Sequence, residues 1–240
     1  MENQFSRSEM VFGAAAMQRL ARARVAVFGL GGVGSYVVEA LARGGVGALD
    51  LVDSDCVDLT NLNRQLLATH ETLGQAKVDV AAQRVQAINP ACQVTTYQCF
   101  YLPETAAQFP FDAYDYVVDA VDTTTAKISL VLRAQEAGVP VISCMGTGNK
   151  LDPTVLRVAD LFATQNDGLA RIMRKQLRKA GITQLKVVYS PEEPAQPRGE
   201  VPPVPEGSSR HVVPGSTSFV PGVAGLIIAG EVLKDLTAVE

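Results

Sequence analysis

The sequence contains only four cysteines in 240 residues, and no two of them form a CxxC pair. They stand far apart in the chain, at Cys56, Cys92, Cys99 and Cys144. Zinc knuckles and disulfide frameworks both need cysteines at short, regular spacings. The spacing therefore argues against both kinds of site, and we expect four reduced thiols.

Long hydrophobic runs are missing as well. The longest candidate, residues 219–233, is shorter than the roughly 20 residues that span a bilayer, and Pro221, three glycines and Glu231 interrupt it. The first seven residues, MENQFSR, contain no apolar signal core. We therefore expect no membrane partner and a cytoplasmic location.

The chain also lacks an excess of positive charge. Its formal net charge is −4 at pH 7, so a nucleic-acid partner would have to meet a local basic patch. Only His70 and His211 supply imidazole for acid–base chemistry. Hydrophobic residues make up 47% and charged residues 19% of the chain, which is typical of a globular protein with a sizeable core.

A glycine-rich turn follows directly behind an apolar run. Residues 25–28 (VAVF) lead into GLGGVG and then into a segment that indicates a helix. The glycines of this turn are Gly29, Gly31, Gly32 and Gly34. Glycine lets a backbone bend sharply and approach a ligand, and the free N–H groups of the following helix point at an anion. The pattern predicts a phosphate-binding turn.

Strand-like and helix-like segments alternate after this turn. Strands are predicted at 48–52, 94–99, 116–121 and 139–144, and helices at 73–88 and 125–137. Beyond them we expect strands at 155–160 and 185–189 and helices at 169–180 and 223–236, with a helical lead-in over residues 5–24 laid over the sheet. This alternation predicts an α/β fold with a doubly wound, mainly parallel, Rossmann-like sheet that binds ligands at the carboxyl ends of its strands.

No boundary in the sequence separates two independent domains. We expect one domain over residues 1–240, with a nucleotide-binding core at 1–145 and a substrate-side extension at 146–240. Eight of the thirteen prolines fall between 191 and 221. That density predicts an irregular, mobile loop over residues 191–221.

The residues behind the second strand limit what the glycine turn binds. Asp53 lies nineteen residues after Gly34, where a Rossmann dehydrogenase places its ribose-binding acid, so an NAD-dependent dehydrogenase is the first competitor. Such an enzyme does not account for the polar groups that follow, which are Asp55, Asn61, Arg64 and Gln65. Together they suit a highly charged polyphosphate.

Lys77 and Asp122 each allow two interpretations. Lys77 stands at a predicted helix start, where it either reaches phosphates or is simply solvated. Asp122 follows Asp119 at the end of the fourth strand, where it either caps the next helix or binds Mg²⁺. Because the strand ends of a parallel sheet share one edge, these residues and the glycine turn converge there.

One predicted helix carries a row of cations. On the segment LARIMRKQLRK the positive side chains fall at i, i+3, i+4, i+7 and i+8, and Leu169, Ile172, Met173 and Leu177 form the opposite stripe. The cations are Arg171, Arg174, Lys175, Arg178 and Lys179. This face either neutralises phosphates of a nucleic acid or is a solvated helix surface.

Four runs together resemble the ThiF-type activating enzymes, the superfamily that includes the ubiquitin-activating enzymes: GLGGVG at 29–34, DSDCVDLTNLNRQ at 53–65, GQAK at 74–77 and DAVDT at 119–123. The resemblance covers nearly the whole chain. Within the superfamily, the runs FSRSE at 5–9, VYSPE at 188–192 and PGSTSFVP at 214–221 are similar to the tRNA threonylcarbamoyladenosine dehydratases. That branch uses ATP to close the threonylcarbamoyl side chain of a tRNA adenosine into a ring.

The resemblance implies a role for each candidate residue. Glycines of the turn, with Asp55 and Gln65, bind the nucleotide; Asp53 bonds the ribose; Asn61, Arg64 and Lys77 hold the phosphates; and Asp122 holds Mg²⁺. Arg7 would reach the γ-phosphate from the other subunit of a homodimer, and the basic helix would bind tRNA. Arg64, Lys77, Asp122 and Arg7 are thus the expected catalytic residues, and a sulfur-transfer protein stays open as a further partner.

Two other functions stay open. The chain would be an adenylyltransferase that activates the carboxyl terminus of a sulfur-carrier or ubiquitin-like protein, although such enzymes usually hold zinc with two CxxC pairs. A nucleotide-binding regulatory module is the non-enzymatic alternative, and it would need neither Arg64 nor Lys77. Cys144 as an acyl acceptor and His211 as the base for ring closure are the remaining candidates, each weighed against a purely structural or solvated residue.

Overall fold

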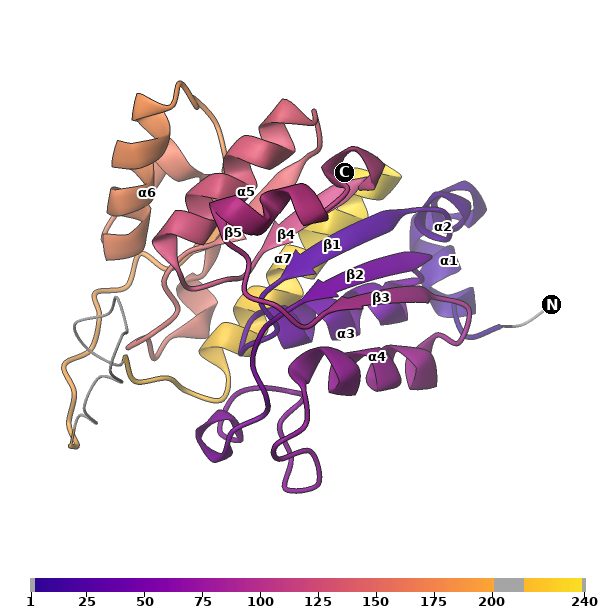
Figure 1. Ribbon diagram of the computed structural model, residues 1–240, viewed down its shortest axis with the longest axis horizontal. Coiled ribbons are helices and arrows are strands. Elements are labelled where there is room, and N and C mark those ends of the chain that lie inside the picture. Colours follow the sequence, from indigo (N-terminus) through magenta and orange to yellow (C-terminus); the bar gives the residue numbers. More distant parts are fainter. Residues whose placement is uncertain (1–2, 201–213, 239–240) are drawn as a thin grey trace.

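One sheet of seven strands organises the computed structural model, which describes residues 3–200 and 214–238 (Figure 1). The strands are β1 (Arg24–Phe28), β2 (Ala48–Val52), β3 (Gln93–Tyr97), β4 (Tyr116–Asp119), β5 (Val141–Cys144), β6 (Arg157–Asp160) and β7 (Lys186–Tyr189). Their order is β3-β2-β1-β4-β5-β7-β6, and every pair is parallel except β6 with β7. The predicted α/β, doubly wound, mainly parallel fold is confirmed.

The helices run between the strands. They are α1 (Ser6–Phe12), α2 (Ala14–Leu20), α3 (Gly34–Gly44), α4 (Lys77–Ile88), α5 (Thr124–Glu136), α6 (Gly168–Lys179) and α7 (Val220–Thr237). Short 3₁₀ turns lie at Leu59–Asn61, Pro103–Gln108, Phe111–Ala113, Pro153–Val155 and Leu161–Ala163. Among the described residues, none of the helices has both the length and the hydropathy of a membrane-spanning segment.

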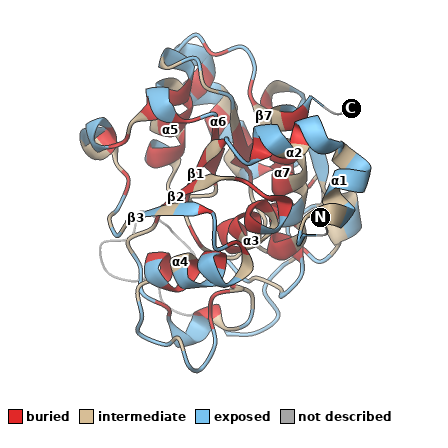
Figure 2. Ribbon diagram, turned by 90° about the vertical axis from the view of Figure 1, so that its right-hand side faces the viewer, coloured by how far each residue is buried: buried red, intermediate tan, exposed pale blue. Residues whose placement is uncertain are grey.

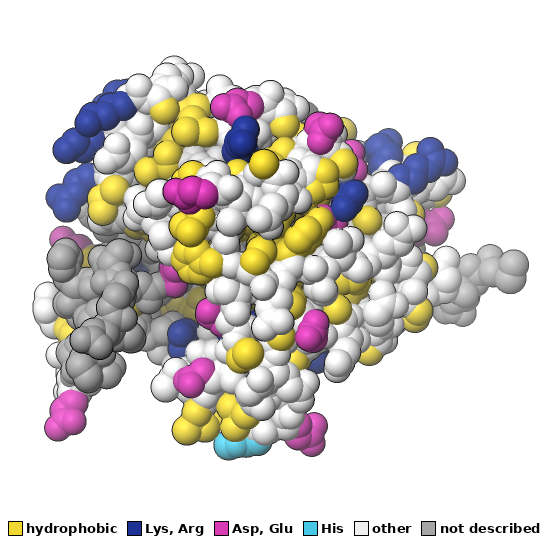
Figure 3. Space-filling model, viewed as in Figure 1, with side chains coloured by type: hydrophobic (Ala, Val, Ile, Leu, Met, Phe, Trp, Pro, Cys, Tyr) yellow, Lys and Arg dark blue, Asp and Glu magenta, His cyan; other side chains and the backbone are white. Residues whose placement is uncertain are grey.

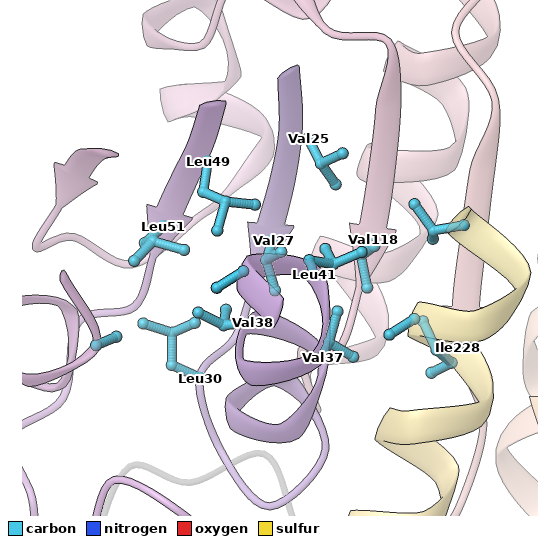
Figure 4. Close-up of a cluster of buried hydrophobic side chains, with 14 of the residues drawn as sticks. Val25, Val27, Leu30, Val37, Val38, Leu41, Leu49, Leu51, Val118 and Ile228 are labelled. Carbon is cyan, nitrogen blue, oxygen red and sulfur yellow. The ribbon is translucent and has the colours of Figure 1, made fainter. Parts of the chain in front are cut away.

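The two faces of the sheet are covered by different helices. Side chains of α3, α4 and α7 pack with β1 and β2 into one core, and α5 and α6 cover the other face. The labelled residues of Figure 4 show the part of that core between the strands and helices α3 and α7. Strands buried on both faces read as continuous apolar runs, which is why VAVF and YVV signalled strands. In Figure 2 burial is concentrated in the strands and on the helix sides that face them.

Glycines let α7 lie unusually close to α3. A Cβ on Gly225 would stand 2.4 Å from the carbonyl oxygen of Val33, and one on Gly222 would stand 3.1 Å from the Tyr36 ring. Pro221, in the first turn of α7, lies beside Gly32. The helix from residues 220–237 therefore backs the glycine turn directly.

Several predicted boundaries were wrong by two or more residues, and three of them have a clear local reason. The helix predicted from residue 73 begins at Lys77, because Gly74 has a φ of 77° and Ala76 is extended. The strand predicted to 121 ends at Asp119, whose carboxylate accepts a hydrogen bond from the Val121 N–H at 3.3 Å. The last helix begins at Val220, since proline is tolerated in a helix's first turn.

The lead-in also differs from the prediction. It forms two helices separated by Gly13, whose φ is 82°, and α2 packs against α7 at the edge where the strands begin rather than over the sheet. Residues 201–213 of the predicted loop 191–221 lie outside the described residues, so its mobility stays a prediction, as does the division at residue 145. Pro221 is not part of that loop, because it belongs to α7.

Candidate active site

The glycine turn joins β1 to α3 at the carboxyl edge of the sheet. Gly29 has a φ of 88°, and a Cβ there would stand 2.7 Å from the carbonyl oxygen of Ala120 behind β4. A Cβ on Gly34 would stand 1.7 Å from the carbonyl oxygen of Gly29. Both positions require glycine, because they hold the turn closed against its own backbone and against the β4 loop.

Gly31 faces open space instead. The nearest atom to a Cβ at Gly31 is Gln65 Nε2 at 3.8 Å. The Gln65 side chain is buried, and its Oε1 has no hydrogen-bond donor among the described residues. A buried acceptor without a partner is costly, so this cradle suits a ligand that brings a donor.

Asp53 ties the second strand to the glycine turn. Its carboxylate accepts hydrogen bonds from the N–H groups of Leu30 at 2.6 Å and Asp55 at 2.8 Å. Burial raises the pKa of Asp53, while Lys77 and the two N–H donors act in the opposite direction. The side chain therefore lies at the floor of the turn, where the sequence placed a ribose-binding acid.

Lys77 is buried rather than solvated. Its side chain is 5% exposed, and its Nζ lies 2.8 Å from the Asp55 carboxylate and 4.0 Å from that of Asp53. The solvated interpretation of Lys77 is thus wrong. Because the charge is held beside Asp53, it lies within reach of groups bound over the turn.

Arg64 lies on the other side of the glycine turn. Its Cγ would be 3.3 Å from a Cβ at Gly32, and its Nη1 donates to the Thr60 carbonyl and to Asn63 Oδ1, both at 2.9 Å. Asn61 is buried, and its Oδ1 accepts a hydrogen bond from the Asp58 N–H. The 53–65 run therefore folds back so that Arg64 and Gln65 lie against the turn, and the Asn61 carbonyl accepts hydrogen bonds from the N–H groups of both.

A buried ion pair holds the loop behind β4. Asp119 is fully buried, and Lys127 on α5 donates to both of its carboxylate oxygens at 3.0 Å. The same carboxylate accepts the Val121 N–H, next to Asp122. Asp119 was predicted to lie at the carboxyl edge of the sheet, where ligands bind. Its two carboxylate oxygens instead accept hydrogen bonds from Lys127.

Lys127 was missed although a signal was present. It precedes the buried residues Leu130, Val131 and Ala134 by three, four and seven positions, so it shares the inner face of α5. A lysine on an apolar face indicates a buried counter-ion, and Asp119 is the acid eight residues before it.

Asp122 is exposed at the carboxyl edge, where its carboxylate accepts a hydrogen bond from Thr123 Oγ1 at 3.3 Å. No group of three His, Cys, Asp or Glu side chains within residues 3–200 and 214–238 is arranged to hold a metal ion. One carboxylate is nevertheless a usual protein contribution to a Mg²⁺ ion that also binds substrate phosphates. The donor set fits such a metal and not an all-protein metal cage.

Arg7 lies far from this site in its own chain. It is an exposed residue of α1, whose neighbours α2 and Gly45 lie where β1 and β2 begin (Figure 1). The glycine turn is at the opposite edge. An Arg7 that contacts the site can therefore come only from another copy of the chain.

The five cations of α6 line one open depression on the surface. In Figure 3, Lys and Arg side chains gather at the upper left, where Figure 1 shows α6. Ala170, Met173 and Leu177 form the buried face of the helix. Ile172 was predicted on the apolar stripe but is 46% exposed. The buried face runs through Ala170, Met173 and Leu177, and Ile172 lies beside that face.

Cys144 is buried, and burial raises the pKa of its thiol to about 12. A thiol with that pKa is neutral at physiological pH and not a nucleophile, so the structural interpretation of Cys144 is favoured. His211 lies outside the described residues.

The sheet order places the glycine turn at the β1–β4 switch point, with an acid after β2 and a buried lysine and an arginine beside it. These features define an α/β nucleotide-binding protein with a phosphate site at the carboxyl edge of its sheet. The chain belongs to the ThiF family, whose model matches residues 5–240.

Relatives of known function support the same assignment. The chain is 44% identical over 98% of its length to the Bacillus subtilis (strain 168) tRNA threonylcarbamoyladenosine dehydratase, of which the alignment covers 95%. The Escherichia coli (strain K12) enzyme of the same name is 40% identical over 72% of this chain and 65% of that protein. The predicted resemblance to this branch is confirmed.

Solved structures agree with the fold along nearly the whole chain. E. coli tRNA N6-threonylcarbamoyladenosine dehydratase, TcdA, solved in complex with AMP, has a TM-score of 0.88 at 34% identity and covers 98% of this chain and 94% of that chain. The same enzyme has been solved with ATP, at 33% identity and a TM-score of 0.88. E. coli MccB, at 19% identity and a TM-score of 0.68, shares the fold.

Proposed function

We propose that this chain is an ATP-dependent tRNA threonylcarbamoyladenosine dehydratase, which closes the threonylcarbamoyl side chain through adenylation of its carboxylate. The observation that carries the proposal is the 44% identity to the B. subtilis enzyme along nearly the full length of both proteins. The site agrees with it, since buried Lys77 and the glycine turn meet at one edge of the sheet.

ATP fits the cradle at the glycine turn. Its phosphates would lie over the open face of Gly31, between Arg64 and Lys77, and its ribose beside Asp53. The unpartnered Oε1 of Gln65 would accept a hydrogen bond from the nucleotide. Gly29, Gly32, Gly34, Asp55 and Asn61 would shape the same pocket. A solved relative of this chain holds ATP.

Positive charge is what the first chemical step needs. The substrate carboxylate is already ionised near neutral pH, so it attacks the α-phosphate without a general base, and pyrophosphate leaves. Arg64 and Lys77 would hold the anions together and stabilise the charge that develops on the phosphate oxygens. A nitrogen of the same threonylcarbamoyl group then attacks the acyl carbon, gives up its proton and releases AMP.

Magnesium is the metal that this donor set suits. Asp122 would hold a Mg²⁺ ion, which would neutralise charge on the phosphates when bound. The carboxylate is presented by the turn behind β4, which the Asp119–Lys127 pair stabilises from below.

Further parts of the proposal concern partners. The chain would act as a homodimer in which Arg7 of one copy reaches the γ-phosphate in the other, and α6 would bind the tRNA. Residues 1–145 would hold the nucleotide and residues 146–240, with the loop from 191, the tRNA side. A sulfur-transfer partner and the cytoplasmic location stay predictions.

Pyrophosphate release from ATP tests the proposal. It should be stimulated by tRNA that carries threonylcarbamoyladenosine and not by a sulfur-carrier protein, and the tRNA product should have lost the mass of one water. Stimulation by the carrier protein alone would favour the alternative function, activation of a sulfur-carrier protein. This chain is also similar to a sulfur carrier protein adenylyltransferase of Thermus thermophilus, at 38% identity over 54% of this chain. No turnover with either substrate would favour a regulatory module.

Two glycine substitutions should have opposite effects. Gly31→Ala should leave the melting temperature almost unchanged, because its Cβ meets no backbone atom, yet weaken ATP binding at least about 10-fold by filling the cradle. Gly34→Ala should lower stability by about 3 kcal/mol or more, since its Cβ overlaps the Gly29 carbonyl. Calorimetric ATP titration and thermal melting measure the two effects, and wild-type ATP affinity in Gly31→Ala would contradict the proposed cradle.

A further inference from the structure

The five cations of α6 are not equivalent. Arg174 is half-buried, and its Nη1 donates to the Thr164 carbonyl at 3.0 Å, to Thr164 Oγ1 and to the Leu161 carbonyl at 3.5 Å. The Arg178 guanidinium lies 5.3 Å from the centre of the Phe162 ring. Both side chains are thus directed onto the 3₁₀ turn at Leu161–Ala163 that precedes the helix.

The other three cations, which like Arg178 are exposed, form a row along the helix. Arg171, Lys175 and Lys179 follow one another at four-residue intervals, which places them about 6 Å apart along the helix axis. That interval is close to the separation of successive phosphates along a polynucleotide strand.

No carboxylate within residues 3–200 and 214–238 lies within 4 Å of any of the five cations. Arg43 and Arg133, which are also exposed, are by contrast ion-paired, with Glu39 and Glu136 respectively. An uncompensated row of like charges in a chain of net charge −4 indicates an anionic partner.

The basic surface of α6 suits an RNA partner better than a membrane. A basic helix that binds lipid inserts its apolar face, whereas the apolar face of α6 is already buried in the protein core. The amino-terminal end of α6 also lies at the carboxyl edge of the sheet, because Asp167 accepts hydrogen bonds from the N–H groups of Gly146 and Ala170. The row therefore begins beside the proposed substrate side and leads away from it.

We propose that Arg171, Lys175 and Lys179 form a phosphate track that binds the sugar–phosphate backbone of the substrate RNA, while Arg174 and Arg178 hold α6 on the protein. The proposal rests on the function proposed above and specifies it further, because it gives the path of the RNA: the backbone leaves the site at Arg171 and runs along α6 toward Lys179.

The salt dependence of RNA binding tests the track. Binding of an unmodified tRNA transcript is followed by fluorescence anisotropy at KCl concentrations from about 50 to 200 mM. The triple variant Arg171→Gln, Lys175→Gln, Lys179→Gln should bind at least about 10-fold more weakly at low salt, and the slope of log K against log[KCl] should be shallower by about 2–3. Each single substitution should reduce that slope by roughly 1.

Two controls separate the track from net charge and from structure. The triple variant Arg22→Gln, Arg43→Gln, Arg133→Gln loses the same charge from exposed positions off α6 and should keep the wild-type slope. Arg174→Gln should lower the melting temperature, because it loses its carbonyl partners, and leave the slope of the folded protein unchanged.

The proposal is overturned if the track variant keeps the wild-type slope or if the off-helix triple variant flattens the slope equally. It also fails if Arg174→Gln changes the slope as much as Lys175→Gln does, or if the track substitutions abolish binding to anionic vesicles while RNA binding is unaffected. Pyrophosphate release with modified tRNA is measured in parallel. No release by the wild type, with a flattened slope in the track variant, rejects the proposed function and leaves the track standing.

Discussion

Lys77→Met should lower the rate of ATP-dependent pyrophosphate release by at least about 10²-fold. The lysine brings a buried positive charge to the edge of the sheet where the glycine turn is open, and its Nζ lies 4.0 Å from Asp53. Methionine keeps the apolar stem and removes the charge. The measurement is a coupled pyrophosphate assay at saturating modified tRNA.

The effect on folding should be much smaller. Asp55, the closer partner of Lys77, is 62% exposed, so solvent screens that ion pair, and we expect a loss of about 1–2 kcal/mol. Lys186 offers a matched control, because it is also ion-paired, with Asp235 at 2.8 Å, but stands at the beginning of β7, on the opposite edge. Lys186→Met should cost similar stability and leave turnover unchanged. Turnover of Lys77→Met within a few-fold of wild type would reject the phosphate role.

Lys127→Met should destabilise the protein by about 3–5 kcal/mol, which lowers the melting temperature by roughly 6–20 °C. The substitution leaves the Asp119 carboxylate at 0% exposure without its only cationic partner among the described residues. Removing one member of a buried pair is costly, since the remaining charge has neither water nor a counter-ion to stabilise it. Urea denaturation of both proteins measures the difference.

A second substitution should restore much of that loss. In the double variant Lys127→Met, Asp119→Asn the buried charge is gone, and the amide oxygen can still accept the Val121 N–H. Arg133→Gln on the same helix is the surface control, because its partner Glu136 is 67% exposed, and it should change stability by less than about 1 kcal/mol. If Lys127→Met were as stable as Arg133→Gln, the Asp119–Lys127 ion pair would not contribute to stability.

The fold and the convergence of the site could be predicted because both depend on sequence order. Continuous apolar runs mark buried parallel strands, and a parallel sheet brings residues such as Asp53 and Asp122 to one edge. Segment boundaries were less accurate where a single backbone conformation decides, as at Gly74 and Ala76 before α4.

The use of each charge could not be predicted in the same way. Asp119 and Asp122 are three positions apart in one motif, yet one is buried with Lys127 and the other is exposed. The cations of α6 fall on one helical face, but Arg174 donates a hydrogen bond to the Thr164 carbonyl. Such pairings depend on how α5 and the turn before α6 pack, which hydrophobic periodicity does not specify.

The close packing of α7 on α3 has a consequence for biosynthesis. Strands β2 to β7 are all translated between Gly32 and Pro221, two residues that lie side by side in the folded protein. Because a ribosome adds about 5–20 residues per second, the glycine turn waits on the nascent chain for the helix that backs it. Long-range contacts of this kind also slow folding. We therefore expect a ribosome-bound chain that stops before residues 220–237 to carry an unfinished nucleotide site.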